Sequence, residues 1–392
     1  MNDSLRYLED TARDRARRGL NRCLISRGAA PPGHIFVDCR KCIHFGSNDY
    51  LGLAADPRVV AAATEATFRY GWGAGASALV SGWSDAHQGL AAALAVFEEV
   101  DAVALFPTGF ASNLGTISAL VGPGDAVYLD RLDHASIVAG ARLSGARLRV
   151  YPHADAARLN AILTRDSGRF RHRLIATDGV FSMDGDLAPL AAIAAIAERH
   201  DAVLLVDEAH ATGVVGPDGR GAAALLDVER NVHVRVGTLS KALGSLGGFV
   251  AGSTTLINHI MNHAGSLIYS TSTPPAAAAA AHAALDVARS EPALRSRLEA
   301  HGRRLRERLR EAGLAVPESA APIIPITLGE PERALDAARR LAERGFFVPA
   351  IRPPTVPAGT ARLRVSLSAA HDVDQIDALA EAIVDLFSVN AI

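Results

Sequence analysis

The sequence predicts an α/β protein with a mostly parallel central sheet, followed by a smaller α+β domain. From about residue 57 to about residue 285, short apolar segments alternate with Ala-rich or charged helical stretches. This alternation is typical of parallel strands that helices cover on both faces. After about residue 286 the alternation ends, and a long helix rich in Arg and Glu precedes more widely spaced strands.

Three segments follow from this pattern. Residues 1–56 are expected to form a charged amphipathic helix over residues 4–27 and two short strands within residues 35–45. The large domain, residues 57–285, is expected to begin with a helix at Val59–Tyr70 and to include another at Leu190–Arg199. Its predicted strands are Ala102–Phe106, Ala126–Leu129, Leu148–Tyr151, Leu174–Thr177, Val203–Val206, Val232–Val236 and Gly248–Ala251.

The alanine run Ala276–Ala281 follows two prolines and predicts a helix packed closely on a neighbour. The small domain comprises residues 286–392. Its predicted helices are Pro292–Ala312, Glu332–Arg344 and one that begins at Asp372; its predicted strands are Ile323–Leu328, Phe347–Val348 and Leu363–Ser366.

The composition excludes several classes of protein. A hydrophobic fraction of 49% with a net charge of −2 indicates a globular chain without a basic face for nucleic acid. No apolar run is long enough to span a membrane, and acids interrupt the basic N-terminus, so we expect neither a signal peptide nor a membrane partner. Three cysteines do not make a disulfide framework, which favours a reducing, cytoplasmic location.

Two motifs suggest other functions, and we do not favour either. Cys39-x-x-Cys42 has no second cysteine pair to complete a zinc site, so we expect no metal. Residues Gly71–Ala76 fit the spacing G-x-G-x-x-A, but a predicted helix precedes them where a dinucleotide-binding loop needs a strand. An oxidoreductase that binds a dinucleotide therefore remains only an alternative.

The informative residues lie where predicted strands end. Phe106–Asn113 is a Gly-containing turn that opens a helix, and the N–H groups at a helix N-terminus bind phosphate well. Asp207 ends a buried strand, where a carboxylate needs a cationic partner, and His210 lies three residues further on.

Lys241 follows the next predicted strand, in the small-residue loop Thr238–Gly244. The chain has only two lysines, and the other, Lys41, lies in a polar turn. An imine-forming amine, a counter-ion for a ring nitrogen and a phosphate turn are together what pyridoxal 5'-phosphate requires.

Seven motifs in order then resemble those of the α-oxoamine synthases, a family of pyridoxal-phosphate enzymes of fold type I (aspartate aminotransferase-like). They are Phe45–Gly52, Pro107–Asn113, Asp133–Ser136, Asp178–Gly185, Val206–His210, Thr238–Lys241 and Ile268–Ser272. The resemblance covers about residues 20 to 370. It implies that residues 57–285 bind the cofactor.

The resemblance also implies site residues. Lys241 would form the imine and then act as the base at Cα, Asp207 would pair with the pyridine nitrogen, His134 would stack on the ring, and His210 would bind the ring oxygen. Further cofactor contacts would come from Gly109, Phe110, Ser182 and Thr238, and from Ser270 and Thr271 of a partner subunit, which implies a homodimer with shared sites. Substrate contacts would come from Arg22, Asn48, Arg352 and Thr355.

The substrate assignment rests on fewer residues. Ala350–Arg364 resembles the C-terminal signature of the biotin-pathway branch of this family, which condenses L-alanine with pimeloyl-CoA or pimeloyl-acyl carrier protein. Ser77 is followed by Ala78, where relatives that use glycine commonly have Arg, and this favours alanine. Ala78 and Leu79 also differ from the Gly-His expected in the biotin-pathway branch. A synthase that condenses glycine or serine, and a non-catalytic partner subunit, remain alternatives.

Overall fold

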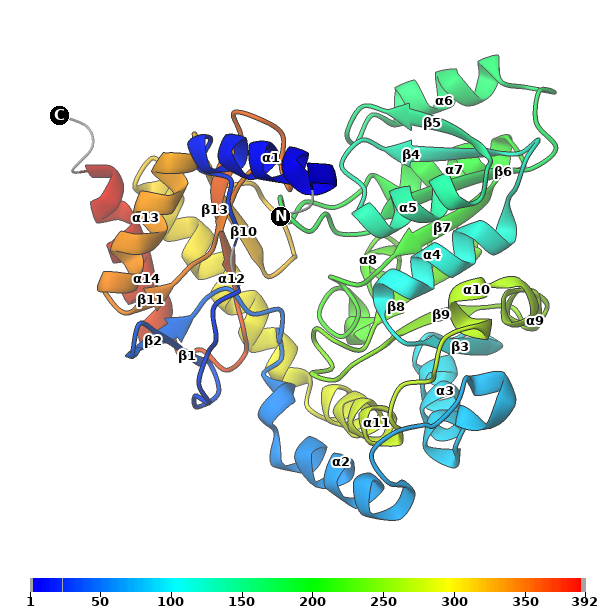
Figure 1. Ribbon diagram of the computed structural model, residues 1–392, viewed down its shortest axis with the longest axis horizontal. Helices are drawn as coiled ribbons and strands as arrows, with labels where there is room; N and C mark the ends of the chain where they lie inside the picture. The colour runs from blue at the N-terminus through cyan, green and yellow to red at the C-terminus, as the bar shows by residue number, and fades with distance from the viewer. Residues whose placement is uncertain (1–2, 23, 389–392) are drawn as a thin grey trace. The chain divides into compact units, whose positions relative to one another are not determined.

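The computed structural model describes residues 3–22 and 24–388, in two compact units. One unit comprises Asn48–Glu299 and Ser319–Ala321, and the other comprises Met1–Ser47, Ala300–Glu318 and Pro322–Ile392. The N-terminal segment thus belongs to the same unit as the C-terminal residues, and the long helix α12 (Pro292–Glu311) begins in one unit and ends in the other. Figure 1 shows the chain from blue to red.

The larger unit is built on a seven-stranded sheet of order β3-β9-β8-β7-β6-β4-β5. Strand β9 runs antiparallel to both its neighbours, and the other neighbouring strands are parallel. The strands are β3 (Ala102–Phe106), β4 (Ala126–Asp130), β5 (Arg147–Tyr151), β6 (Arg173–Asp178), β7 (Val203–Asp207), β8 (Val234–Thr238) and β9 (Gly248–Gly252). The predicted α/β fold with a mostly parallel sheet is confirmed.

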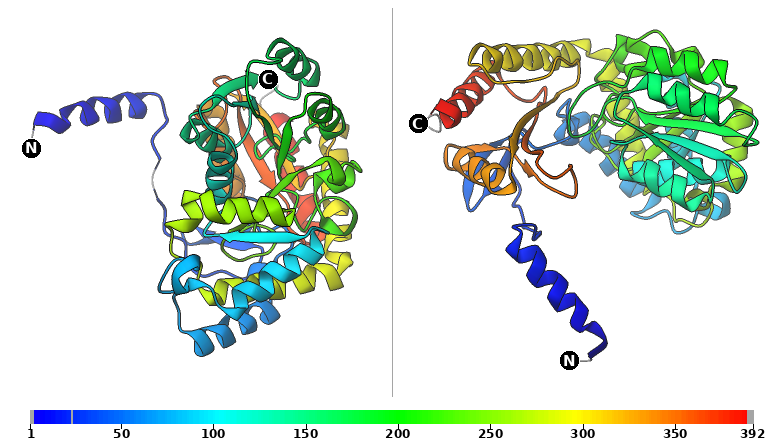
Figure 2. Two further views of the ribbon diagram at one scale, coloured as in Figure 1. Left: turned by 90° about the vertical axis from the view of Figure 1, so that its right-hand side faces the viewer. Right: turned by 90° about the horizontal axis from the view of Figure 1, so that it is seen from above.

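Both faces of this sheet are buried. Alternate strand residues such as Phe106, Leu129 and Leu205 join one apolar cluster with Ile117, Ile137 and Ile260 of the covering helices. The residues between them, such as Leu105, Tyr128 and Leu204, are buried as well. Helices lie on both sides of the strands (Figure 2), which explains why central strands such as β4 and β7 read as apolar runs. The edge strand β5 carries two arginines and is partly exposed.

The helices of the larger unit agree with the predicted alternation. They are α2 (Pro57–Tyr70), α3 (Asp85–Phe97), α4 (Gly109–Leu120), α5 (Ala135–Leu143), α6 (Ala156–Arg165), α7 (Leu190–Arg199), α8 (Ala222–Leu225), α9 (Thr254–His263), α10 (Gly265–Ile268) and α11 (Pro275–Ser290). The alanine-rich α11 packs on α2 and α3, as its small side chains predict. A five-residue π-turn, Ala78–Gly82, was not predicted.

Strand β8 lies two residues later than predicted. Gly237 and Thr238 extend it because Gly237 lacks a side chain: a Cβ there would lie 2.2 Å from the ring of Phe249. Arg235, in the middle of the strand, is buried and donates to the Glu98 backbone carbonyl at 2.6 Å. The apolar pattern alone does not reveal a buried arginine.

The second unit contains two three-stranded sheets. One has the order β1-β2-β11, with β1 (His34–Val37), β2 (Arg40–His44) and β11 (Phe346–Phe347). The other has the order β10-β13-β12, with β10 (Ile323–Gly329), β12 (Ala350–Ile351) and β13 (Ala361–Ser366). Helix α13 (Pro331–Glu343) packs on both sheets and on α14 (Val373–Ser388).

The N-terminal helix is shorter than predicted. A 3-10 turn (Asp3–Leu5) leads into α1 (Arg6–Arg17), whereas the sequence predicted a helix to residue 27. Gly19, with φ of +62°, follows the last helical turn, and its N–H donates to the Ala16 carbonyl. A left-handed glycine at this position ends the helix.

Two further observations on the described residues concern membrane-spanning helices and metal sites. None of the helices in residues 3–22 and 24–388 is both long and apolar enough to cross a membrane. In the same residues, no cluster of three or more His, Cys, Asp or Glu side chains is arranged to hold a metal ion. Cys39 is exposed in a turn and Cys42 is buried beside the Ala342 carbonyl.

Candidate active site

The predicted motifs of the larger unit meet at one edge of the seven-stranded sheet. Asp130, Asp178, Asp207 and Thr238 are the last residues of β4, β6, β7 and β8. Asp178 and Asp207 are direct neighbours in the register of β6 and β7. Because carboxyl ends of parallel strands share one edge, motifs far apart in the sequence come together there.

Asp207 is a buried carboxylate at the end of β7. It is 4% exposed and accepts hydrogen bonds from Nδ2 of Asn113 at 2.5 Å and from the Ala209 N–H at 2.8 Å. Among the residues that the structure describes, none forms an ion pair with it. A buried charge is costly when it is not paired, so this position is suited to a cationic group of a ligand.

A glycine turn positions Lys241. The Gly244 N–H donates to the Lys241 carbonyl at 2.9 Å, and Gly244 has a φ of +58°. A Cβ at Gly244 would lie 2.4 Å from the backbone nitrogen of Ala54, so the turn needs glycine both for its conformation and for its close packing. The half-buried Lys241 side chain acts electrostatically on His134 and Asp178 and therefore belongs to the same site.

His134 lies at the start of α5, next to the same strands. Its backbone N–H donates to Oδ2 of Asp178 at 2.7 Å, and its Nδ1 lies 2.7 Å from Oγ of Ser136. Surrounding protein atoms desolvate the imidazole and lower its pKa; the Lys241 charge lowers the pKa further, and the Asp207 charge opposes both effects. The ring is therefore favoured in its neutral form.

Two further carboxyl groups share this edge of the sheet. Burial raises the pKa of Asp133, and the charges of Asp178 and Asp130 raise it further. Burial likewise raises the pKa of Asp178, as does Asp207, while the charge of Lys241 lowers it. A positive group bound here would relieve the repulsion between these acids.

His210 is held by a tyrosine. The Tyr50 hydroxyl lies 2.7 Å from Nδ1 of His210, and it also donates to Oδ1 of Asn48 at 3.2 Å. Tyr50 is fully buried and His210 is 6% exposed. The predicted residues Asn48 and His210 are thus joined through Tyr50, which received no role in the sequence analysis.

The N-terminus of α4 provides an anion site. Thr108 caps the helix by accepting from the Ala111 N–H at 3.0 Å, while the Gly109 and Phe110 N–H groups have no partner in the described part of the chain. A Cβ at Gly248 would lie 2.6 Å from the nitrogen of Gly109, so the strand behind the turn must carry glycine. Free N–H groups at a helix start are suited to a phosphate.

Thr238 lies against this turn, whereas Ser182 lies in the turn after β6. The Thr238 hydroxyl donates to the Gly247 carbonyl at 3.0 Å and lies 2.8 Å from Oγ of Ser240. A Cβ on Gly109 would lie 3.2 Å from Oγ1 of Thr238, which places the end of β8 against the start of α4. Ser182 is half-buried in the turn after β6, which the Gly185 N–H closes onto the Phe181 carbonyl at 2.8 Å.

Ser270 and Thr271 lie in a partly exposed segment beside residues 71–77, which contain the glycine motif Gly71–Ala76. Thr271 pairs with Ser77 in an isolated antiparallel bridge, and the Ser272 N–H donates to the Ala76 carbonyl at 3.0 Å. These contacts hold the loop and the segment together.

Three predicted substrate residues form their own cluster in the other unit. Nη2 of Arg22 donates to Oγ1 of Thr355 at 3.2 Å, and the Thr355 N–H donates to the Arg352 carbonyl at 3.1 Å. The Arg352 guanidinium donates to the Gly19 and Asn21 carbonyls. Each guanidinium keeps N–H groups for a further acceptor, since an arginine has five.

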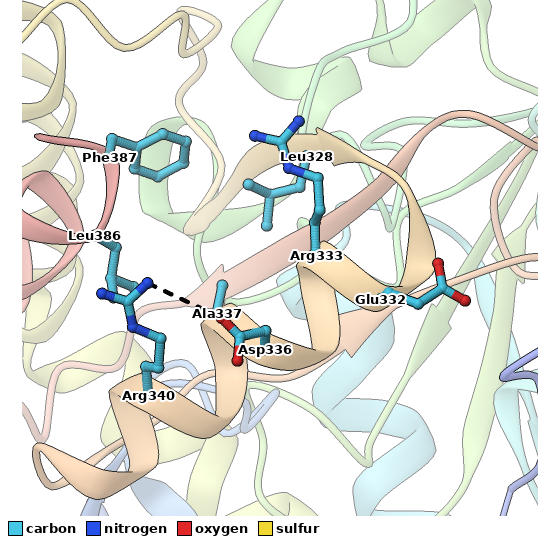
Figure 3. A pocket seen from close by; sticks show the side chains of 8 residues that line it. All are labelled: Leu328, Glu332, Arg333, Asp336, Ala337, Arg340, Leu386 and Phe387. Carbon is cyan, nitrogen blue, oxygen red and sulfur yellow. Dashed lines mark ion pairs between the residues drawn. The ribbon is translucent and has the colours of Figure 1, made fainter. Parts of the chain in front are cut away.

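A cavity of about 500 Å³ in the same unit contains none of the predicted residues (Figure 3). It is lined by apolar side chains and by charged residues of α13, including Arg340 and Asp336, which pair at 3.9 Å. It offers no amine, histidine or hydroxyl group for the predicted chemistry.

Sequence reasoning missed Asn113 and Tyr50 as members of the site. Both lie inside motifs that it identified, Pro107–Asn113 and Phe45–Gly52. Their partners are 94 and 160 residues away in the sequence, so no local pattern could assign them.

Comparisons with known proteins agree with this geometry. The family model "Aminotransferase class I and II" matches residues 40–383. The 8-amino-7-oxononanoate synthase of Anaeromyxobacter dehalogenans strain 2CP-1 is 49% identical over 94% of this chain and 93% of its own, and that of Methylococcus capsulatus strain Bath is 49% identical over 90% of each.

Solved structures give the same fold. Serine palmitoyltransferase from S. paucimobilis with a bound PLP–myriocin aldimine superposes with a TM-score of 0.93 at 30% identity and covers 99% of both chains. An 8-amino-7-oxononanoate synthase from Francisella tularensis superposes with a TM-score of 0.77 at 30% identity, covering 90% of this chain and 99% of its own. The chain therefore belongs to the class I and II aminotransferase family of fold type I and, within it, to the 8-amino-7-oxononanoate synthases.

Proposed function

We propose that the protein is a pyridoxal-phosphate-dependent acyltransferase of biotin biosynthesis. It condenses L-alanine with a pimeloyl thioester, of CoA or of acyl carrier protein, and releases 8-amino-7-oxononanoate, CO₂ and the free thiol. The observation that carries this proposal is the buried Asp207, which has no cationic partner among the described residues and ends the strand next to the one that leads to Lys241. Relatives that are 49% identical over most of their length support the choice of reaction.

The residues at the sheet edge fit pyridoxal phosphate. Asp207 would hold the protonated pyridine nitrogen, the Gly109 and Phe110 N–H groups would hold the phosphate, and Ser182 and Thr238 would make further contacts with the cofactor. Lys241 would bind the aldehyde carbon, His134 would cover the ring, and His210 would form a hydrogen bond with the ring oxygen. When bound, the cofactor supplies an electron sink for negative charge at the substrate Cα.

Lys241 has a second role in this proposal. Once the substrate amine has replaced it, its free amine removes the Cα proton of alanine. The Asp178 carboxyl group, on which Lys241 acts electrostatically, would help to balance the positive charge that the amine gains with the proton. A base positioned against one C–H bond typically contributes a factor of about 10² to 10⁴ in rate.

The arginine cluster of the other unit would recognise carboxylates. Arg352 would bind the carboxylate of alanine, Asn48 would make a further substrate contact, and Arg22 and Thr355 would contact the pimeloyl chain. The existing hydrogen bond between Arg22 and Thr355 supports a joint role. A guanidinium suits carboxylate recognition because it can donate two parallel hydrogen bonds.

A homodimer with shared sites completes the proposal. Several large apolar side chains of the larger unit are highly exposed: Phe68 (87%), Trp72 (72%), Val80 (79%) and Tyr269 (87%). We expect a second copy of the chain to cover them and its Ser270 and Thr271 to reach the phosphate. We also expect a cytoplasmic location. Sedimentation equilibrium would test the dimer.

Thiol release from pimeloyl-CoA with alanine, glycine or serine tests the reaction. We expect alanine to give the highest kcat/KM; a preference for glycine or serine would favour the alternative of another synthase of this family. A non-catalytic subunit is tested separately. The loaded protein should absorb visible light, and Lys241→Ala should abolish that band; a colourless loaded wild type would contradict catalysis.

A further inference from the structure

A chain of hydrogen bonds links Asp207 to His134 through two side chains without an assigned role. Nδ2 of Asn113 donates to Oδ2 of Asp207 at 2.5 Å and to Oγ of Ser136 at 3.0 Å. Oγ of Ser136 lies 2.7 Å from Nδ1 of His134. The four residues come from the end of β7, from α4 and from the start of α5, so the chain joins three elements of the site.

The chemistry of the groups fixes the direction of each hydrogen bond. An ionised carboxylate only accepts, so the Asn113 amide must turn its NH₂ group toward Asp207. The second amide hydrogen then goes to Ser136, whose oxygen accepts it. The single hydroxyl proton of Ser136 is left for Nδ1 of His134.

A second contact supports this direction. The backbone N–H of Ser136 also donates to Nδ1 of His134, at 3.3 Å. A nitrogen that accepts two hydrogen bonds carries no proton, so the proton of a neutral imidazole must be on Nε2. The charged groups that face the ring are Asp207, Asp178 and Lys241, and the lowered pKa of His134 agrees with a neutral ring.

The burial of Asn113 supports the same orientation of its amide group. The residue is 1% exposed, and its Oδ1 has no hydrogen-bond partner among the described residues. A buried acceptor without a partner is destabilising. In this orientation the amide oxygen has no partner among the described residues, whereas both N–H groups of the amide donate hydrogen bonds.

We propose that Asn113 and Ser136 are positioning residues that hold His134 as the neutral tautomer with its proton on Nε2 and couple it to Asp207. The carboxylate expected to pair with the pyridine nitrogen and the imidazole expected to stack on the ring are thereby linked through Asn113 and Ser136. This inference rests on the proposed function, because it assigns His134 and Asp207 to the cofactor.

The protonation of the two imidazole nitrogens of His134 can be measured directly by NMR. In the holoenzyme with ¹⁵N-labelled histidine, His134→Gln identifies the two nitrogen signals of His134 among those of 14 histidines. We expect Nδ1 to have the shift of an unprotonated nitrogen and Nε2 that of a protonated one at neutral pH, with a pKa below that of a free imidazole. In Ser136→Ala and Asn113→Leu, the two signals should move toward each other and the pKa should rise.

Ser118→Ala is the matched control. It removes a hydroxyl from the same helix α4, and that hydroxyl donates only to the Leu114 and Gly115 carbonyls; the His134 signals should not change. If Asn113→Leu does not fold, Ser136→Ala decides the outcome, since it deletes a single oxygen. Unchanged His134 signals in Ser136→Ala, or a mixture of tautomers in the wild type, would overturn the proposal.

A kinetic measurement separates positioning from structure. We expect kcat/KM to fall about tenfold or more in Asn113→Leu and Ser136→Ala, with a changed pH profile, and to stay near the wild-type value in Ser118→Ala. The nitrogen spectra are recorded without substrate. A failure of the hydrogen-bond chain and a failure of the assigned reaction therefore give different results.

Discussion

The Tyr50 hydroxyl lies 2.7 Å from Nδ1 of His210, although 160 residues separate the two in the sequence. Both side chains are buried, and the loop that carries Tyr50 packs against the loop that carries Lys241, where Gly244 meets Ala54. The residue expected to hold the ring oxygen of the cofactor is thus oriented by a segment that precedes the whole sheet.

Removal of this hydroxyl should impair the reaction more than the fold. In Tyr50→Phe we expect kcat to fall about tenfold, because a hydrogen bond that orients His210 is worth about 1–1.5 kcal/mol, while Tm changes little. Tyr128→Phe is the control, since it deletes another buried hydroxyl, which contacts Asp166 at 3.4 Å. Equal losses of kcat in both variants would contradict an orienting role for Tyr50.

Replacement of Asp207 by Asn should affect the protein differently with and without the cofactor. Without cofactor, Asp207→Asn removes a buried charge that has no cationic partner in the described part of the chain, so Tm should stay the same or rise. With cofactor, the charge that would hold the pyridine nitrogen is lost, and we expect kcat/KM to fall about 100-fold or more.

Thermal melting with and without added pyridoxal phosphate checks the Asp207→Asn prediction. The cofactor should raise Tm clearly in the wild type and much less in the variant. An equal rise in both proteins would show that Asp207 does not pair with the cofactor.

The sequence predicted the sheet well because most of its strands are buried on both faces and read as largely apolar runs. It also predicted site roles for Lys241, Asp207 and the turn at Gly109, because these residues lie at or just after the ends of strands in recognisable motifs. It could not assign Asn113 or Tyr50, whose contacts depend on the folded sheet, and it extended the first helix past Gly19. The periodicity of apolar residues indicates which positions are buried. The partner of a polar side chain depends instead on which strands and helices the fold brings together.

Substitution of Gly244 should displace Lys241. In Gly244→Ala the new Cβ would lie 2.4 Å from the Ala54 nitrogen, at a φ of +58°, so the turn that carries Lys241 must move. We expect a loss of about 2 kcal/mol or more in the free energy of unfolding, together with weaker visible absorption of the loaded protein.

Gly313→Ala is the matched control for this turn. Gly313 also has a positive φ, of +83°, but a Cβ added there would meet no described atom within 4 Å. Because of the conformational strain alone, Gly313→Ala should lower the free energy of unfolding by only about 1 kcal/mol, and the loaded protein should keep its visible absorption. Equal effects of the two substitutions on absorption would contradict the close packing at Gly244.

The stability of the larger unit should depend on pH through His153. Its Nδ1 lies 3.1 Å from Asp130 and its Nε2 lies 2.8 Å from Asp186, and these two carboxylates raise the pKa of His153 to about 10. Because the folded pKa is raised, the stabilisation is complete below the unfolded value of about 6.5 and is lost as the pH rises toward 10.

The variant His153→Gln tests this pH dependence. We expect its free energy of unfolding to be lower than that of the wild type by roughly 1–2 kcal/mol near pH 6, and the difference to disappear near pH 10, as measured by chemical unfolding. His200→Gln should behave oppositely, because burial and Arg199 lower the pKa of His200, and its removal should stabilise the protein only at acidic pH. A constant difference between wild type and His153→Gln across this range would contradict the ion pairs as the source of the stabilisation.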